Sequence, residues 1–211
     1  MDVRAPRSAA AALVTVLAAS VLVGCASQAA QPMATLGGGP VATLAPQATA
    51  APTAATTLGS DFAVDLDLTV AGTATQITIL NQAKALILAY EKAVEADDPK
   101  DPAYQSLVVG RALSSLYQSV STYKSSAQRP TGTDLFYDFT TDVSAGLGAD
   151  VLFCEDRTQE HLVNSGTGAA VKDADTGEQH WDFGFDANSN GTWSIAFVST
   201  QAVTAGSTQC T

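Results

Sequence analysis

The sequence contains few basic residues. It has 10 Lys and Arg against 21 Asp and Glu, and its formal net charge is −11. Arg4, Arg7 and the acidic Asp2 precede Cys25, which leaves 8 basic and 20 acidic residues beyond it, a net charge of −12. Nucleic acid and anionic lipid headgroups repel a surface this acidic, and no basic stripe is present. We therefore exclude nucleic-acid binding.

Cysteine and histidine are also scarce, and common catalytic motifs are missing. The three cysteines and two histidines form neither a CxxC pair nor a cluster at zinc-site spacing. No GxSxG motif occurs. Asp186 to Gly191 matches the first half of an EF-hand loop, but Phe197 occupies the position of its bidentate glutamate. We predict a hairpin turn there, no metal site and no cofactor.

The start of the chain has the pattern of an export signal. Arg4 and Arg7 precede an uncharged apolar stretch, 9–23, which is shorter than the about 20 residues of a membrane span. Leu22-Val23-Gly24-Cys25 resembles the lipobox of bacterial lipoproteins, in which small residues admit the peptidase and the thiol accepts a diacylglyceryl group. The resemblance implies a signal peptide over 1–24 and acyl chains such as palmitate on Cys25. The alternative is a plain signal peptide with an incidental cysteine.

Residues 25–60 differ in character from the segment that follows. From Ala26 to Ser60 the chain is uncharged and rich in Ala, Thr, Pro and Gly, a composition that cannot offset its ordering entropy, so we predict a disordered tether. In DFAVDLDLTVA apolar residues then alternate with small or polar ones, which indicates a strand or extended arm over 61–72. We expect it to pack on its own domain rather than to dock a partner by strand addition.

Helical periodicity begins near Thr73, which has the spacing of a capping box with Gln76. The first helix is predicted to end near Ala96, ahead of Asp97-Asp98-Pro99. Asp101-Pro102 begins a short helix, and Gly110 separates it from a longer one. The apolar stripe of the longer helix is Leu113, Leu116, Tyr117, Val120 and Tyr123.

Period-two patterns follow Gly132 and predict strands. The first strand is expected to bury its odd-numbered residues, Leu135, Tyr137, Phe139 and Val143, and to expose Asp134 and Asp138. A second, more buried strand covers 151–154. The last two form a hairpin in which Trp181, Phe183 and Phe185 share a face with Trp193, Ile195 and Phe197. A three-residue loop, 189–191, would pair 183 with 197 and 185 with 195.

Helices followed by strands predict an α+β fold, with N-terminal helices packed on a curved antiparallel sheet. This order resembles the NTF2-like (cystatin-like cone) domain of small actinobacterial lipoproteins. The matching segments are ALILAYEKAV, DPKDPAYQSLVVGRAL, VLFCEDRT, the TGE turn at 176–178 and NGTWSIAF…GSTQC. The resemblance covers 73–211 and implies a fold more than an activity.

Two cysteines remain once Cys25 carries lipid. From the residues alone, Cys154 and Cys210 either form one disulfide, stay as buried thiols or bridge two chains. The cysteines at these places are partners in the lipoprotein group, so the resemblance implies a Cys154–Cys210 disulfide.

The resemblance also implies where a ligand would bind. Side chains lining the cone would come from Tyr90, Tyr117, Tyr137, Phe139, Trp181 and Phe183. Alternative acid and base groups are His180, Asp182 and Asp138. His180 and Asp182 lie on the face opposite Trp181 and Phe183, so only one of the two sets can point inward, and the larger aromatic set is favoured.

Two functions are compatible with these patterns. The first is a lipid-anchored extracytoplasmic binding or assembly module on the outer face of the cell membrane. Its partners would be the membrane, through Cys25, and an envelope protein or a second copy of the chain, through the sheet. The second is an NTF2-like isomerase, dehydratase or hydrolase. A cone filled by aromatic rings favours the module, whereas an open cavity with a carboxylate or histidine beside a tyrosine favours the enzyme.

Overall fold

The computed structural model of the chain describes residues 48–49, 53–144, 148–172, 177–204 and 210. All of them belong to one unit, Thr43–Thr211. The predicted signal peptide, Cys25 and the tether up to residue 47 lie outside the described residues. Among the residues described, no helix has the length and apolar character needed to cross a membrane.

The three predicted helices form with the expected caps. They are α1 (Ala74–Glu95), α2 (Pro102–Gln105) and α3 (Gly110–Ser125). Thr73 Oγ1 accepts a hydrogen bond from the Gln76 amide at 3.3 Å, and Gln76 Oε1 accepts one from the Thr73 amide at 2.9 Å, which completes the capping box. Asp101 caps α2 by accepting from the Ala103 amide at 2.7 Å.

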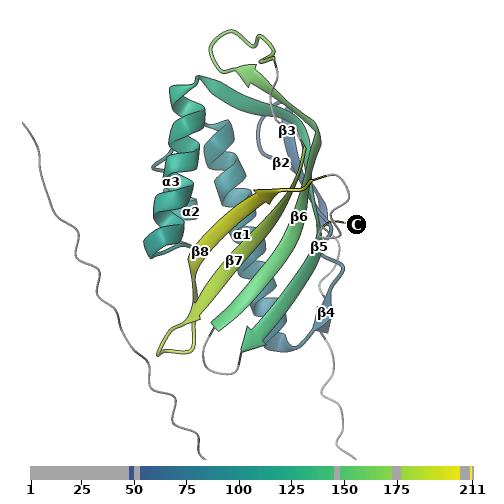
Figure 1. Cartoon of the computed structure of the whole chain (residues 1–211), viewed down its shortest axis with the longest axis vertical. Helices are drawn as coiled ribbons and strands as arrows, with labels where there is room; N and C mark the ends of the chain where they lie inside the picture. Colours follow the sequence, from purple (N-terminus) through teal and green to yellow (C-terminus); the bar gives the residue numbers. More distant parts are fainter. Residues whose placement is uncertain (1–47, 50–52, 145–147, 173–176, 205–209, 211) are drawn as a thin grey trace, which may run out of the picture. The chain divides into compact units, whose positions relative to one another are not determined.

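Six strands form one mixed sheet beside the helices. In spatial order they are β2 (Thr53–Thr57), β3 (Phe62–Leu66), β5 (Gln128–Ser144), β6 (Gly148–Asn164), β7 (Glu178–Ala187) and β8 (Trp193–Ala202). The pair β3–β5 is parallel and every other pair is antiparallel. Figure 1 shows the helices on one face of the sheet and the long strands β5 and β6 bending. The predicted α+β class is confirmed, with a parallel pair that the sequence did not indicate.

The N-terminal strands revise the predicted domain limits. β2 lies inside the segment predicted to be a disordered tether, and a short pair, β1 (Ala48–Thr49) with β4 (Ala71–Gly72), lies outside the main sheet. The predicted arm is strand β3, which buries alternate residues, Phe62, Val64 and Leu66, in the core of its own domain. The folded domain therefore begins at least 20 residues before Thr73, since β2 starts at Thr53.

A bulge in β5 overturns part of the predicted alternation. The ladder between β5 and β6 shifts register between Tyr137 and Thr140, and Asp138 adopts a left-handed φ of 54°. Phe139 therefore faces the core as predicted, whereas Phe136, at 1% exposure, takes the inner position expected for Tyr137. Ahead of the bulge the even-numbered residues are buried, including Asp134, which was predicted to face solvent.

The C-terminal hairpin has the predicted loop, but the predicted position of the Phe197 ring is wrong. The Asn188 amide donates to the Thr192 carbonyl at 2.8 Å around a loop of residues 189–191, whose glycine has a φ of +80°. Phe185 pairs with Ile195 as predicted. A register shift next to Phe185 then pairs Phe183 with Val198 rather than with residue 197. Val198 is buried, and the Phe197 ring is 42% exposed.

The disulfide between Cys154 and Cys210 is present, with a Cα–Cα distance of 5.8 Å. It ties the end of the chain to β6 on the sheet face that points away from the helices. This face of β5–β8 is called the outer face below, and the face toward the helices is called the inner face.

Removing this disulfide should lower stability. It closes a loop with a sequence separation of 56, for which the chain-entropy relation gives about 4 kcal/mol. We expect the double variant Cys154→Ala/Cys210→Ala to melt roughly 10 °C lower by calorimetry. Cys25→Ser serves as the control and should leave the melting temperature unchanged. Equal melting of the double variant and the wild type would contradict a structural role for the disulfide.

Candidate functional site

Aromatic rings fill the inner face of the sheet. Phe153 on β6 stacks on Phe139 with ring centroids 5.0 Å apart and meets Phe183 edge-on at 4.9 Å. Trp181 stacks on the other side of Phe153 at 6.0 Å, and Tyr90 from α1 meets the Trp181 ring edge-on at 6.1 Å. Such contacts stabilise by about 0.5–1.5 kcal/mol beyond area burial. The interior that would form a ligand pocket in an open cone is therefore occupied by side chains.

A group of charged side chains lies buried at one end of this aromatic core. It comprises Glu91 on α1, Asp134 on β5, and Glu155, Arg157 and Glu160 on β6, each at most 8% exposed. Buried charges are rare unless they are paired. Here four carboxyl groups share one guanidinium, so the group is not balanced by its own residues. We call it the acidic cluster.

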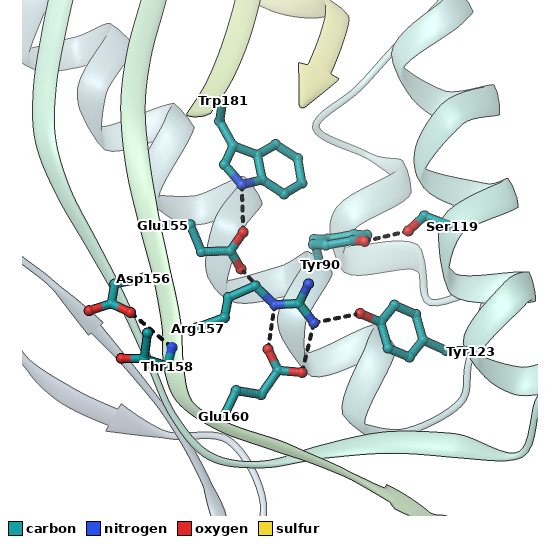
Figure 2. Close-up of polar contacts among 9 residues, drawn as sticks. All are labelled: Tyr90, Ser119, Tyr123, Glu155, Asp156, Arg157, Thr158, Glu160 and Trp181. Atoms are coloured by element: carbon teal, nitrogen blue, oxygen red, sulfur yellow. Dashed lines mark hydrogen bonds and ion pairs between the residues drawn. The ribbon is translucent and has the colours of Figure 1, made fainter. Parts of the chain in front are cut away.

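A bulge in β6 brings the acidic cluster together. The ladder between β5 and β6 shifts register at Asp134, where Arg157 and Thr158 oppose a single residue. Asp156 Oδ1 accepts a hydrogen bond from the Thr158 amide at 2.8 Å and supports the bulge (Figure 2). Because of the extra residue, Arg157 and Glu160 both face inward although they are three positions apart.

Arg157 is held from several sides, as Figure 2 shows. Its Nε and Nη2 donate to the two carboxylate oxygens of Glu160 at 2.5 and 2.8 Å, a bidentate pair. Nη2 also donates to the Tyr123 hydroxyl at 3.1 Å, while Nε lies 3.9 Å from Glu155 Oε1. Trp181 Nε1 donates to the other oxygen of Glu155 at 2.7 Å. The guanidinium charge is thus directed mainly to Glu160.

The remaining carboxyl groups, Glu91, Asp134 and Glu155, resist ionisation. Burial, followed by the charges of Glu91, Glu160 and Glu155 and by a hydrogen bond that protonated Asp134 makes with Glu160, raises the pKa of Asp134 to about 11. Burial raises the pKa of Glu155 to about 7, against the opposing effects of Arg157 and the Trp181 hydrogen bond. Burial also raises the pKa of Glu91 well above its ordinary value. These groups therefore favour a proton or a cation at neutral pH.

The same three carboxyl groups border a small cavity of about 30 Å³. One oxygen from each of Glu91, Asp134 and Glu155 lies within 4.8 Å of the other two. Asp134 Oδ1 is fully buried and has no hydrogen-bond partner among the residues that the structure describes. A cavity of this size holds about one water molecule or one ion, so it has no room for an organic substrate.

The structure separates the residues predicted to line a pocket. The residues found in the aromatic core are Tyr90, Phe139, Trp181 and Phe183. Tyr117 is 41% exposed on α3, and the Tyr137 hydroxyl donates to Glu178 Oε1 at 2.7 Å on the outer face. Tyr117 instead borders a hollow of about 540 Å³ beside α2 and α3, and Tyr137 lies on the outer face, so neither belongs to the aromatic core.

The predicted acid and base candidates lie on the outer face. Neighbouring Trp181 is buried against the helices, so His180 and Asp182 point the opposite way. Exposed Asp138 and half-buried His180 border an open hollow of about 430 Å³ together with Leu152. Burial, and then the nearby Asp150, raise the pKa of Asp182, while His180 lowers it.

The outer face combines apolar and acidic groups. The exposed Leu152 borders the hollow just described, and the exposed Phe197 borders a second one of about 290 Å³. Gly184 forms the floor of the second hollow, and a Cβ atom there would come within 3.1 Å of the Phe197 side chain. Asp150 and Asp186 border the same hollow. The outer face is therefore indented, partly apolar and negatively charged.

The acidic cluster was not predicted as a site, although the sequence contains a signal for it. Glu91 lies four residues after Ile87 and three before Val94, which places it on the apolar stripe of α1. The segment EDRTQE directly continues the buried strand VLFC. A charged residue on an apolar face is informative, but only the fold shows that Asp134 lies beside Glu91.

Comparisons with known proteins give only distant matches. No family model and no curated protein matches the chain. A ketosteroid isomerase-like protein from Erwinia carotovora atroseptica has a TM-score of 0.44 at 15% identity, covering 63% of this chain and 99% of that one. An NTF2-like protein with a cystatin-like fold from Novosphingobium aromaticivorans matches with a TM-score of 0.38 at 15% sequence identity. The match covers 64% of this chain and 90% of that one. The intermembrane space region of the chloroplast protein ARC6 matches with a TM-score of 0.38 at 15% sequence identity. The match covers 58% of this chain and 96% of that one.

The description of the Novosphingobium protein names the type of fold that the sequence resembles. Similarity at this level describes an arrangement of helices and strands, and no ligand or activity is transferred from it.

Two substitutions in the acidic cluster should affect stability in opposite directions. Glu160→Gln removes the bidentate partner of Arg157 and leaves a buried guanidinium without compensation, so we expect a loss of about 3–5 kcal/mol in free energy of unfolding. Asp134→Asn removes a buried carboxyl group that forms no ion pair with the described residues, and should be neutral or stabilising in buffer with EDTA. Urea unfolding at pH 7 measures both. A large loss in Asp134→Asn would show that this carboxyl group is needed for the fold itself.

Proposed function

We propose that this protein is a lipid-anchored, extracytoplasmic binding or assembly module of the cell envelope. The observation that carries the proposal is the aromatic core, in which Phe139, Phe153, Trp181 and Phe183 occupy the space that an NTF2-like enzyme would need for substrate. A domain of this fold with a filled interior acts through its surface. The surface that we propose for this role is the outer face of the sheet, which is indented, partly apolar and acidic.

The proposed anchor rests on the sequence of the first 25 residues. A basic start, an apolar stretch of signal-peptide length and Leu22-Val23-Gly24-Cys25 occur in the order of a bacterial lipoprotein signal. Two acyl chains give stable membrane attachment where one does not. The main sheet begins at Thr53, and Ala48–Thr49 already pairs with Ala71–Gly72, so the proposed tether is residues 26–47.

The proposed partner is a second envelope protein with a basic, partly apolar surface. Leu152 and Phe197 supply exposed apolar area on the outer face, and Asp150, Asp182 and Asp186 surround it with negative charge. Two copies of this face would bring like charges together, which opposes a homodimer through the sheet. A partner carrying Lys or Arg complements the same face and associates faster at low salt.

The alternative is a small-molecule enzyme of the NTF2-like type. Its best support is the outer hollow of about 430 Å³, which brings Asp138 near His180. The hollow lies on the solvent side of the sheet, so a substrate there would stay in contact with water. The inner face contains carboxyl groups but only about 30 Å³ of space beside them. We therefore rank the enzyme second.

The anchor is tested by Cys25→Ser. Without the thiol no diacylglyceryl group can be added, so we expect the variant to be lost from the membrane fraction or to remain unprocessed. Membrane fractionation with mass spectrometry of the N-terminus measures both outcomes. Equal membrane retention of the variant, with a mature N-terminus other than residue 25, would contradict lipid anchoring.

The docking face is tested by photo-crosslinking in cells that express the full chain. A benzophenone analogue of phenylalanine is placed at Phe197 on the outer face or, as a matched control, at Tyr117 on α3; the two side chains are 42% and 41% exposed. We expect the probe at 197 to give one dominant adduct with another protein, in a yield that falls as salt is raised. Adducts only from 117, adducts containing only this chain, or no adduct from either position would contradict the proposed partner.

A further inference from the structure

We infer that Glu91, Asp134 and Glu155 form a binding site for a single Ca²⁺ ion, enclosed between α1, β5 and β6. The inference is independent of the proposed docking face, because it concerns the inner side of the sheet. It rests on the geometry of three oxygen ligands, on an unsatisfied buried oxygen and on the charge of the surrounding residues.

The geometry fits one ion held by the protein. One carboxylate oxygen from each residue lies within 4.8 Å of the other two. Ca²⁺–oxygen distances are about 2.3–2.6 Å, so oxygens on opposite sides of an ion lie up to roughly 5 Å apart. The three oxygens can therefore contact one ion, and the cavity of about 30 Å³ that they border provides the space for it.

An unsatisfied oxygen points to a ligand. Asp134 is 1% exposed, and its Oδ1 has no hydrogen-bond partner within the described part of the chain. Buried acceptors are almost always satisfied, and a carboxylate oxygen is more costly to leave alone than a neutral one. The Arg157 guanidinium, which lies beside the cavity, donates to Glu160 and not to this oxygen of Asp134.

The charge of the cluster requires an additional cation or additional protons. Arg157 and Glu160 form a neutral pair, and the same guanidinium lies 3.9 Å from Glu155, whereas Glu91 and Asp134 form no ion pair with any residue that the structure describes. Three buried carboxyl groups thus depend on something beyond the side chains of the cluster. A divalent ion compensates two of their charges in one step, which a water molecule does not.

The ligand set selects among divalent ions. Carboxylate oxygens favour hard cations such as Ca²⁺, Mg²⁺ and Mn²⁺ over zinc or copper. Mg²⁺ usually retains several waters in its octahedral shell, and a cavity of about 30 Å³ cannot contain them. Ca²⁺ accepts bidentate carboxylates in irregular geometry, so three carboxylates can supply up to six oxygens.

Glu155, one of the three proposed ligands, accepts a hydrogen bond from a neighbouring side chain, as metal ligands usually do. Trp181 Nε1 donates to Glu155 Oε2 at 2.7 Å and fixes the orientation of that carboxylate (Figure 2). The same bond places an indole next to the proposed ion. Tb³⁺, a luminescent substitute for Ca²⁺, should therefore be sensitised by tryptophan excitation when it occupies the site.

The test is calorimetric titration of CaCl₂ into the full-length chain, purified in detergent and freed of metal with EDTA. We expect one Ca²⁺ per chain, a raised melting temperature with Ca²⁺, and tryptophan-sensitised Tb³⁺ emission that Ca²⁺ displaces. Asp134→Asn and Glu91→Gln should each weaken binding at least tenfold and abolish the rise in melting temperature. Mg²⁺ should bind more weakly than Ca²⁺.

The matched control is Asp182→Asn, which removes a carboxyl group from the outer face and should bind Ca²⁺ like the wild type. Near-ultraviolet circular dichroism in EDTA shows whether each variant is folded, and Glu91→Gln serves if Asp134→Asn is not. Absence of saturable Ca²⁺ binding at millimolar concentration would overturn the inference and leave the cavity to protons or water. Binding that survives both inner variants, or that Asp182→Asn abolishes, would also overturn it.

Discussion

The bidentate pair between Arg157 and Glu160 is the interaction on which the interior of this protein depends. A guanidinium buried to 8% exposure is tolerated only with a carboxylate and further acceptors around it. Glu160 supplies the carboxylate, and the Tyr123 hydroxyl connects the same guanidinium to α3. The pair thereby fixes the β6 bulge and joins the sheet to a helix. Once its charge is used in this way, the neighbouring carboxyl groups must be stabilised by other means.

The polar and aromatic parts of the inner face are linked through Trp181. Its indole nitrogen donates to Glu155, and its ring stacks on Phe153 within the aromatic core. Trp181 thus contacts both the acidic cluster and the aromatic core. The arrangement has a functional consequence, because the carboxyl groups of the acidic cluster face a space too small for a substrate, while the hollow bordered by Asp138 and His180 lies on the other side of the sheet.

Local signals predicted the local structure well. The capping box at Thr73, the cap at Asp101 and the glycine in the 189–191 loop each depend on a few adjacent residues, and each is present. Errors arose wherever a strand contains a bulge. At Asp138 and next to Phe185 one extra residue reverses which side chains face inward.

The positions of the charged residues were also mispredicted, for the same reason. Asp134 was assigned to solvent because it alternates with Leu135, and the bulge at Asp138 reverses that alternation. The acidic cluster adds residues from α1, β5 and β6, whose proximity depends on strand pairing over long sequence separations. Glu91 on an apolar stripe and the charged segment EDRTQE directly after VLFC were the visible indications. The Cys154–Cys210 disulfide was one of three outcomes that the cysteine count left open, and the resemblance to the lipoprotein group favoured it.

The edges of the sheet explain why the outer face, rather than strand addition, is the proposed route to a partner. The parallel strand β3 covers one side of β5, and Arg129 holds Asp61 ahead of β3 at 2.7 Å. At the opposite edge the Val109 amide donates to the Ile195 carbonyl of β8 at 2.9 Å, so the segment before α3 protects part of that strand. The edge strand beyond β3 is β2, which has only five residues, and a short edge strand together with a partly covered one disfavours pairing with another chain. The segment 61–72, which could have served as a docking arm, is instead used to complete the fold, and recognition is left to the side chains of the outer face.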